Sequence, residues 1–471
     1  MLIFFSAVAC LLLGYLIYSR IVEKIFGADE KAITPAISKC DNVDFMVLPK
    51  WRVFLIQFLN IAGLGPVFGA ILGALYGPVS LLWIVLGSIF AGGVHDYMAG
   101  MISLREEGKS LVPLVEKYMG RKFKSIFLLF MVLFLLLLGS VFAMSPAQMI
   151  ANMLNVKFAW CLSIIFLYYF LATLLPIDKI IGRFYPLFAL LLIGVAIALL
   201  SVLMLNEKTI YPELSLTNLH PQGLPIYPLM FVTIACGALS GFHATQSPLM
   251  ARCLANEKQG RGIFYGAMIT EGIVALIWAT LGMAFYKGSA GLNNTIMQSG
   301  PGGVVSEIAN GYLGTLGGTF AVLSVVLLSI TSGDTAFRSA RLTIGDYWQK
   351  ENKTIRKRLM ISAIVLSGGI AMSFFDLTVI WTYFGWANQC LAAMTLWMAC
   401  FYLKKHHKNY LITLVPAGFI TSIVITYIMY DKIGFRLPLN WSVVTGIIIS
   451  AILVISFILK AEKNAKSQND I

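Results

Sequence analysis

Two stretches decide the fold, Asn60-Ile61-Ala62-Gly63-Leu64-Gly65-Pro66-Val67-Phe68-Gly69 and Ile234-Ala235-Cys236-Gly237-Ala238-Leu239-Ser240-Gly241-Phe242-His243. Each lies within a long apolar segment and is rich in glycine, and the first also contains a proline. Glycine and proline at these places favour an unwound backbone over a continuous helix. The two stretches therefore predict two discontinuous helices inside a membrane.

The composition places the chain in a membrane. Its 471 residues are 58% hydrophobic and only 12% charged, whereas a soluble domain carries about 25% charged residues. Apolar segments of roughly 20 residues, the length that crosses a bilayer as a helix, recur along the chain and predict an all-α polytopic membrane protein with about 13 transmembrane helices. This pattern excludes a disordered chain, a repeat solenoid and a nucleic-acid-binding domain.

The lysines and arginines indicate the orientation. The chain has 35 of them, and they gather in alternate connecting segments, as cytoplasmic loops do. With the N-terminus outside, the external segments hold only Lys157, Lys208, Lys287, Lys432 and Arg436. We therefore expect the N-terminus outside and the C-terminus inside.

The two glycine-rich stretches run through the membrane in opposite directions. Broken helices at corresponding positions of two oppositely oriented halves are typical of inverted-repeat transporters. This predicts a leading transmembrane helix with a cytoplasmic connector (1–50), a first repeat (51–205), an external linker (206–224), a second repeat (225–402), and a trailing helix pair with a cytoplasmic tail (403–471). Taken singly, each glycine cluster is also typical of close helix packing.

The two stretches predict the solute site. The N-terminus of a half-helix at mid-membrane offers unpaired N–H groups and a positive dipole end, which a carboxylate satisfies. At the second stretch, His243 is either part of this site or a core histidine bonded to a neighbouring carbonyl. The candidate substrate-binding residues are Gly63, Gly65, Gly237, Ser240, Gly241, His243, Gln246 and Ser247.

Ionisable side chains within the membrane are costly, so each is a functional candidate. His95 and Asp96 form either a proton relay or a structural pair facing water. The carboxyl of Glu271 either carries a proton or bridges two helices. Asp334 and Arg338 are spaced i, i+4 on one helix, so they form either an ion pair that fixes the orientation of this helix or part of an ion-coupling site.

Two series of residues resemble the carbon starvation protein (CstA) family. The resemblance runs in register through both halves, to about Arg341, and it implies a transporter of the amino acid–polyamine–organocation group in the bacterial cytoplasmic (inner) membrane. It also implies a 5+5 inverted repeat with a leucine-transporter-like core. The series comprise Ile61-Ala62-Gly63, Gly65-Pro66, Trp83, Gly87, Ala91-Gly92, Asp96-Tyr97, Ser103 and Arg105, then Thr233 to Ala244, Gln246-Ser247-Pro248, Asn256-Glu257, Tyr265 to Met268, Glu271, Thr331, Asp334, Arg338 and Arg341.

The resemblance also implies where a coupling ion binds. In leucine-transporter-like folds, hydroxyls of the eighth core helix hold a cation against carbonyls of the first broken helix. The matching residues are Thr331 and Ser332, opposite the carbonyls near Ala62 and Gly65, with Asp334 within one turn. Hydroxyls and carbonyls suit Na⁺, whereas a buried carboxyl suits H⁺. If Arg338 holds Asp334 ionised, Glu271 is the better proton carrier.

We therefore predict a symporter that imports a small organic solute, pyruvate or a related carboxylate first and short peptides next, coupled to H⁺ or Na⁺. Membrane lipid is the other expected partner, no cofactor is expected, and no sequence pattern predicts an oligomeric state. The alternatives are an uncoupled channel or facilitator and, further off, an intramembrane enzyme or sensor. The chain has no Walker A, H-E-x-x-H or G-x-S-x-G motif, and its cysteines lack metal-ligand spacing.

Overall fold

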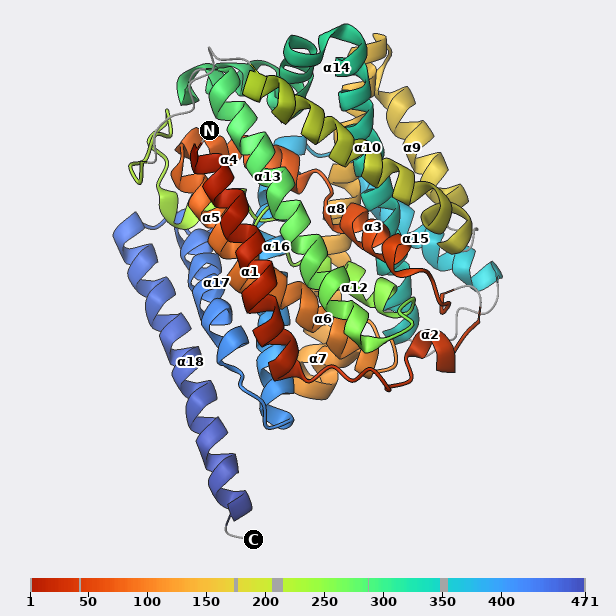
Figure 1. Cartoon of the computed structure of the whole chain (residues 1–471), viewed down its shortest axis with the longest axis vertical. Helices are drawn as coiled ribbons and strands as arrows, with labels where there is room; N and C mark the ends of the chain where they lie inside the picture. Colours follow the sequence, from red (N-terminus) through yellow and green to blue (C-terminus); the bar gives the residue numbers. More distant parts are fainter. Residues whose placement is uncertain are drawn as a thin grey trace.

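The computed structural model describes residues 2–41, 44–172, 177–205, 215–286, 288–347 and 355–469. These residues form helices and connecting turns, without a strand, so the predicted all-α class is confirmed. Most helices run along the long axis of the molecule, and the two termini lie near opposite ends (Figure 1). The predicted linker 206–224 is described from residue 215 onward, and its first part lies outside the described residues.

The first half of the chain contains α1 (Leu2–Phe26), α2 (Pro35–Ser38), α3 (Lys50–Ile61), the helical turn η1 (Gly65–Gly69), α4 (Ala70–Gly73), η2 (Ala74–Tyr76), α5 (Val79–Gly87), η3 (Ser88–Gly92), α6 (Gly93–Arg105), α7 (Leu111–Met119), α8 (Arg121–Leu154), α9 (Phe158–Ala172) and α10 (Ile177–Leu205). The second half contains η4 (Ile226–Met230), α11 (Phe231–Thr233), α12 (His243–Ala251), η5 (Glu257–Gln259), η6 (Arg261–Tyr265), α13 (Gly266–Phe285), α14 (Ser289–Tyr347), α15 (Ile355–Met372), α16 (Leu377–Lys405), α17 (Leu411–Tyr430) and α18 (Leu439–Asn469).

Both predicted breaks are present. α3 ends at Ile61, and the chain resumes a helical course at Gly65 after a bend of 56°. In the second break, α11 ends at Thr233 and α12 begins at His243, so residues 234–242 form turns without a helix. The prediction of two discontinuous helices is therefore confirmed.

Helix α14 changes direction twice near its start. Gly300 (φ 68°) and Gly314 (φ 67°) adopt a backbone conformation outside the helical region, one that glycine reaches without steric penalty. These two points set off the segment 301–313 from the long remainder of α14. The segment lies at the end of the molecule where α14 is labelled in Figure 1.

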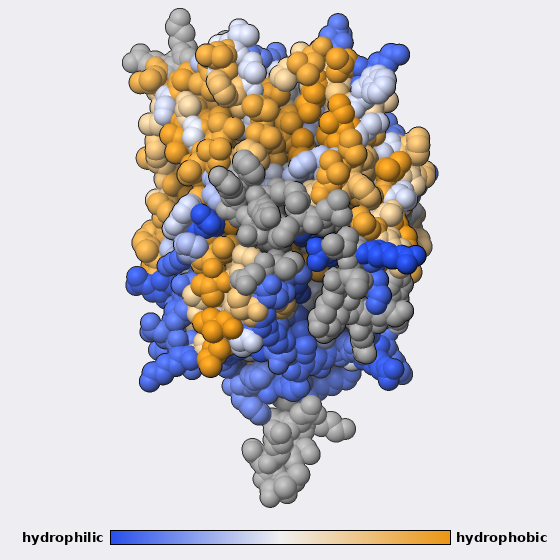
Figure 2. Space-filling model, turned by 90° about the vertical axis from the view of Figure 1, so that its right-hand side faces the viewer, coloured by the Kyte–Doolittle hydropathy of each residue, from blue (hydrophilic) through white to orange (hydrophobic). Residues whose placement is uncertain are grey.

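Eight helices among the described residues are long and apolar enough to span a membrane, or up to ten when each bent helix pair counts as one span. The prediction of about 13 counted three kinds of segment that this criterion treats differently. Phe158–Ala172 is short, residues 225–250 are interrupted, and α15 and α16 meet at 120° and count together. Figure 2 shows apolar residues over most of the upper part of one face and hydrophilic residues at the lower end.

Candidate functional site

The two breaks lie directly against each other. A Cβ atom built on Gly65 would overlap the Cβ and Sγ atoms of Cys236, and one built on Gly69 would lie 2.8 Å from the carbonyl oxygen of Thr233. A Cβ on Gly237 would lie 3.9 Å from the Cα of Pro66. The absence of side chains at these glycines is what allows the two unwound segments to approach each other. Both segments are buried.

Helix α14 reaches the first break through Ser332. A Cβ on Gly63 would lie 3.3 Å from Ser332 Oγ and 2.7 Å from the ring of Phe142. The Ser332 hydroxyl is buried without a hydrogen-bond partner. The hydroxyl of Thr331 instead donates to the carbonyl of Leu328 at 2.9 Å. Of the two predicted coupling hydroxyls, only that of Ser332 is near the first break and uncommitted.

Four ionisable side chains form a continuous buried chain beside the second break. Asp96 uses one carboxylate oxygen for Nδ1 of His95 and the other for Nδ1 of His243, both at 2.8 Å. His243 Nε2 then lies 3.4 Å from Glu271 Oε2. All four side chains have 0% exposure. The sequence named these residues separately, and the fold joins them from α6, α12 and α13.

These four side chains have the chemical groups that proton movement requires. Each histidine can bind a proton on either ring nitrogen, and each carboxyl can accept or release one. Neither oxygen of Glu271 has a hydrogen-bond partner, and neither has Nε2 of His95. Because neighbouring groups lie 2.8 to 3.4 Å apart, a proton bound by one of them changes the proton affinity of the others.

Asp334 and Arg338 form the expected pair, away from this chain. Arg338 Nη2 lies 3.9 Å from Asp334 Oδ2 and donates to the carbonyl of Ala172 at 3.2 Å. Tyr185 donates its hydroxyl to the same Asp334 oxygen at 3.1 Å and to the carbonyl of Thr331 at 3.2 Å. Asp334 is therefore hydrogen-bonded to Tyr185 and lies beside one fixed positive charge, that of Arg338.

Three further candidates contact neighbouring helices instead of the opposite break. Ser247 donates to the carbonyl of His243 at 3.0 Å and accepts from Gln57 at 3.3 Å. Gln246 donates to Ser339 of α14 at 3.3 Å. A Cβ on Gly241 would lie 2.5 Å from the backbone nitrogen of Ala392 in α16. These three positions support the walls of the site.

Sequence reasoning missed two adjacent amides on α16. Asn388 Oδ1 accepts from Ser240 Oγ at 3.1 Å and from the backbone N–H of Phe242 at 2.9 Å. Gln389 donates to the carbonyl of Leu239 at 3.4 Å. They satisfy backbone groups that the second break leaves without helical partners. The signal was a pair of buried amides within an apolar span, which usually marks a functional or structural role.

Helix α3, which leads into the first break, also carries polar atoms without partners. Both amide atoms of Asn60 and Oε1 of Gln57 are buried and unsatisfied. Such atoms are costly unless a ligand, an ion or water completes them. Together with Ser332 they surround the region that the sequence assigned to the solute. No group of three or more His, Cys, Asp or Glu side chains in the described part of the chain is arranged to hold a metal ion.

The chain was then compared with known proteins. The family model described as "Carbon starvation protein CstA" matches residues 1–160, 144–290 and 287–427. A membrane protein of Haemophilus influenzae is 44% identical over 350 residues, which cover 63% of this chain and 94% of that protein. The peptide transporter CstA of Campylobacter jejuni is 26% identical, over 88% of this chain and 78% of that one.

Two other similarities are informative at a coarser level. The pyruvate/proton symporter BtsT of Escherichia coli is 28% identical over 58% of this chain, which spans about half (47%) of that protein. Among solved structures, a manganese transporter of Eremococcus coleocola superimposes with a TM-score of 0.57 at 12% identity, over 89% of this chain and 96% of the other. At that identity the likeness shows a shared transporter fold and nothing about the cargo.

Proposed function

Because the chain belongs to the carbon starvation protein CstA family, we propose that it is a secondary active transporter that imports a small organic solute together with protons. The solute class is pyruvate or a related carboxylate, or a short peptide. One observation carries the proposal: two touching helix breaks adjoin a fully buried chain of two histidines and two carboxyls. The adjacency of these two features supports a solute site next to a proton site.

The breaks suit an anionic group of the solute. Helical turns begin at Gly65 and at His243, immediately after the two unwound segments. The N–H groups of Val67 and Phe68 are bonded to the carbonyl of Leu64, and those of His243 and Ala244 to the carbonyls of Ser240 and Gly241. The positive ends of the two helix dipoles are therefore what favours a carboxylate between the two starts. The unsatisfied amide of Asn60 and the hydroxyl of Ser332 add neutral hydrogen-bonding groups on the first-break side.

The buried chain suits proton coupling. His243 stands first in α12, directly after the second break, and contacts Asp96 on one side and faces Glu271 on the other. A proton on Glu271 can pass to His243 Nε2, while Asp96 stabilises the imidazolium through Nδ1. The solute carboxylate and the imidazolium attract each other, so each favours binding of the other, and this is the coupling.

The observations give less support to sodium and to Asp334 as the coupling residue. The Thr331 hydroxyl is committed to a backbone carbonyl, and Asp334 is held by Tyr185 and Arg338. The pyruvate/proton symporter among the relatives agrees with proton coupling. We also propose the repeat boundaries 51–205 and 225–402, and the N-out, C-in orientation, on the basis of the sequence pattern.

Uptake into proteoliposomes tests this function. Purified protein is reconstituted, and labelled pyruvate and a labelled dipeptide are each offered with an inward proton gradient, with a sodium gradient, or with no gradient. We expect accumulation of at least one solute above its external concentration with the proton gradient alone. Flux that only equilibrates the solute, and that ignores both gradients, would identify a facilitator instead.

A further inference from the structure

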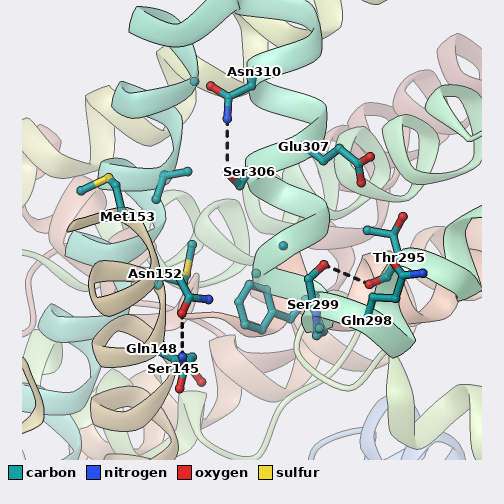
Figure 3. A pocket seen from close by; sticks show the side chains of 18 of the residues that line it. Ser145, Gln148, Asn152, Met153, Thr295, Gln298, Ser299, Ser306, Glu307 and Asn310 are labelled. Carbon is teal, nitrogen blue, oxygen red and sulfur yellow. Dashed lines mark hydrogen bonds between the residues drawn. The ribbon is translucent and has the colours of Figure 1, made fainter. Parts of the chain in front are cut away.

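A cavity lies beyond the first break, between α8 and the kinked start of α14. It has a volume of about 570 Å³, within the range of small-molecule sites. Figure 3 shows that polar side chains from the two helices converge on it. These lining residues are Ser145, Gln148, Asn152, Thr295, Gln298, Ser299, Ser306, Glu307 and Asn310.

The floor of this cavity, here called the vestibule, adjoins the solute site. Phe68, from the turn that follows the first break, lines it. The ring of Phe68 lies 6.1 Å from that of Trp381 in α16. Ser145 also lines the vestibule and stands one helical turn after Phe142, the residue nearest to Gly63. Phe68 and Ser145 therefore link the vestibule to the segments that form and contact the first break.

The chemistry of the lining is specific. Among the residues that the structure describes, it offers amides and hydroxyls, one carboxylate, and no lysine, arginine or histidine. The single carboxylate, Glu307, accepts a hydrogen bond from the Tyr286 hydroxyl at 2.6 Å and is exposed. The Ser145 hydroxyl is 4% exposed and has no partner. A buried hydroxyl that faces a cavity without a partner indicates a ligand that donates or accepts there.

We propose that the vestibule is a separate recognition site for a zwitterionic, amide-bearing solute, whose ammonium group faces Glu307 and whose amide bonds to Gln148 and Asn152. This inference rests on the proposed transport function and selects among its solutes. A carboxylate loses water of hydration there without meeting a cation, in pyruvate and in a dipeptide alike, and pyruvate has no ammonium or amide group whose contacts offset this loss. An ammonium group gains a counter-ion, and an amide finds both donors and acceptors.

Thiol protection tests occupancy of the vestibule without relying on transport. Met153→Cys, at an exposed lining position that makes no proposed contact with the solute, is introduced together with Cys10→Ser and Cys40→Ser, which removes the two exposed cysteines and leaves five buried ones. The detergent-purified protein is treated with a charged methanethiosulfonate. L-alanyl-L-alanine at about ten times its Kd should slow labelling about tenfold, because the rate follows the unoccupied fraction. Pyruvate at equal concentration should leave the rate unchanged.

Asn294→Cys in the same background is the matched control. Asn294 is exposed, immediately precedes the lining residue Thr295 in α14, and is not itself among the residues that line the vestibule. Its labelling should be insensitive to both solutes. Equal protection of Met153→Cys by pyruvate, no protection by the dipeptide, or no labelling at all would overturn the inference.

The role of Glu307 has its own measurement. Glu307→Gln should raise the dipeptide concentration needed for half-protection about threefold, the size expected of an exposed ion pair. N-acetyl-L-alanyl-L-alanine, which lacks the ammonium group, should show no such change. An identical shift for both compounds, or for neither, would refute the ionic contact. Protection without gradient-driven uptake would refute the transport proposal and leave the vestibule inference standing. Uptake of either solute without protection would refute the vestibule inference and leave the transport proposal standing.

Discussion

Glu271 and Asp334 are both buried carboxyls, but they differ in the groups that surround them. Asp334 accepts a hydrogen bond from Tyr185 and faces Arg338, whereas neither oxygen of Glu271 has a hydrogen-bond partner. A carboxylate with a fixed counter-charge holds its charge, and one without partners is free to exchange a proton with a neighbouring histidine. On this contrast we propose proton exchange at Glu271 and structural support from Asp334.

Replacement of Asp334 should therefore damage stability more than coupling. Asp334→Asn leaves the buried Arg338 without its carboxylate, and loss of one partner of a buried pair costs about 3–5 kcal/mol. We expect a lower melting temperature in detergent, largely restored in the double variant Asp334→Asn with Arg338→Gln. Proton-driven accumulation by the double variant should persist. Loss of accumulation at restored stability would make Asp334 the coupling residue after all.

His243 should control how uptake depends on pH. It contacts Asp96 and faces Glu271, and His95 lies on the far side of Asp96, so these are the titratable groups that surround it. His243→Gln keeps a polar side chain and removes the proton site between the two carboxyls. We expect uptake measured between pH 5 and 8 to become flatter, while the exposed His406→Gln changes nothing. A profile that overlays that of the wild type would reduce His243 to a structural role.

At this scale the sequence named the ionisable residues and left their contacts open. Charge inside a membrane is costly, so the positions of His95, Asp96, His243 and Glu271 within apolar spans are enough to single them out. Whether these side chains contact one another depends on how α6, α12 and α13 pack. Spacing along one helix carries no information about contacts between helices. The amides of Asn388 and Gln389 were missed for a related reason, since their partners lie in another segment.

Among the elements, the two breaks follow most directly from sequence. Glycine and proline mark positions where a helix fails, and both breaks lie where these residues cluster. The extent of each break was less predictable. The first spans residues 62–64 and the second residues 234–242, because α16 supplies amide groups that stabilise the longer unwound backbone.

Contact between the breaks predicts a compensating pair of substitutions. Gly65→Ala places a methyl group on the side chain of Cys236, and overpacking of this kind costs about 1–3 kcal/mol. In a Cys236→Gly background only the Cα remains, at 3.4 Å, so the same substitution should cost less than about 1 kcal/mol. Thermal unfolding of the four proteins measures the non-additivity. Additive effects would show that the breaks do not touch.

At the scale of the whole molecule, hydropathy and helix period predicted the class, and the apolar face in Figure 2 is its consequence. The number of transmembrane spans was harder to predict, because interrupted and short segments are as apolar as a transmembrane helix but do not form a continuous helix long enough to cross a bilayer. Packing brings the two helix breaks, with unsatisfied polar atoms beside them, next to the buried side chains of His95, Asp96, His243 and Glu271, which we propose bind the proton. Neither part alone makes a symporter, and their adjacency is the physical basis of coupling.

Solute-driven proton entry is the most direct test of that adjacency. Proteoliposomes with an internal pH dye receive unlabelled dipeptide or pyruvate at equal pH on both sides, and the internal pH is followed for the wild type and for Glu271→Gln, with counterflow exchange as the control for a folded, solute-binding protein. We predict that solute acidifies the interior with the wild type, and that Glu271→Gln keeps counterflow and loses acidification. Solute uptake by the wild type without acidification, or acidification that survives in Glu271→Gln, would contradict the account.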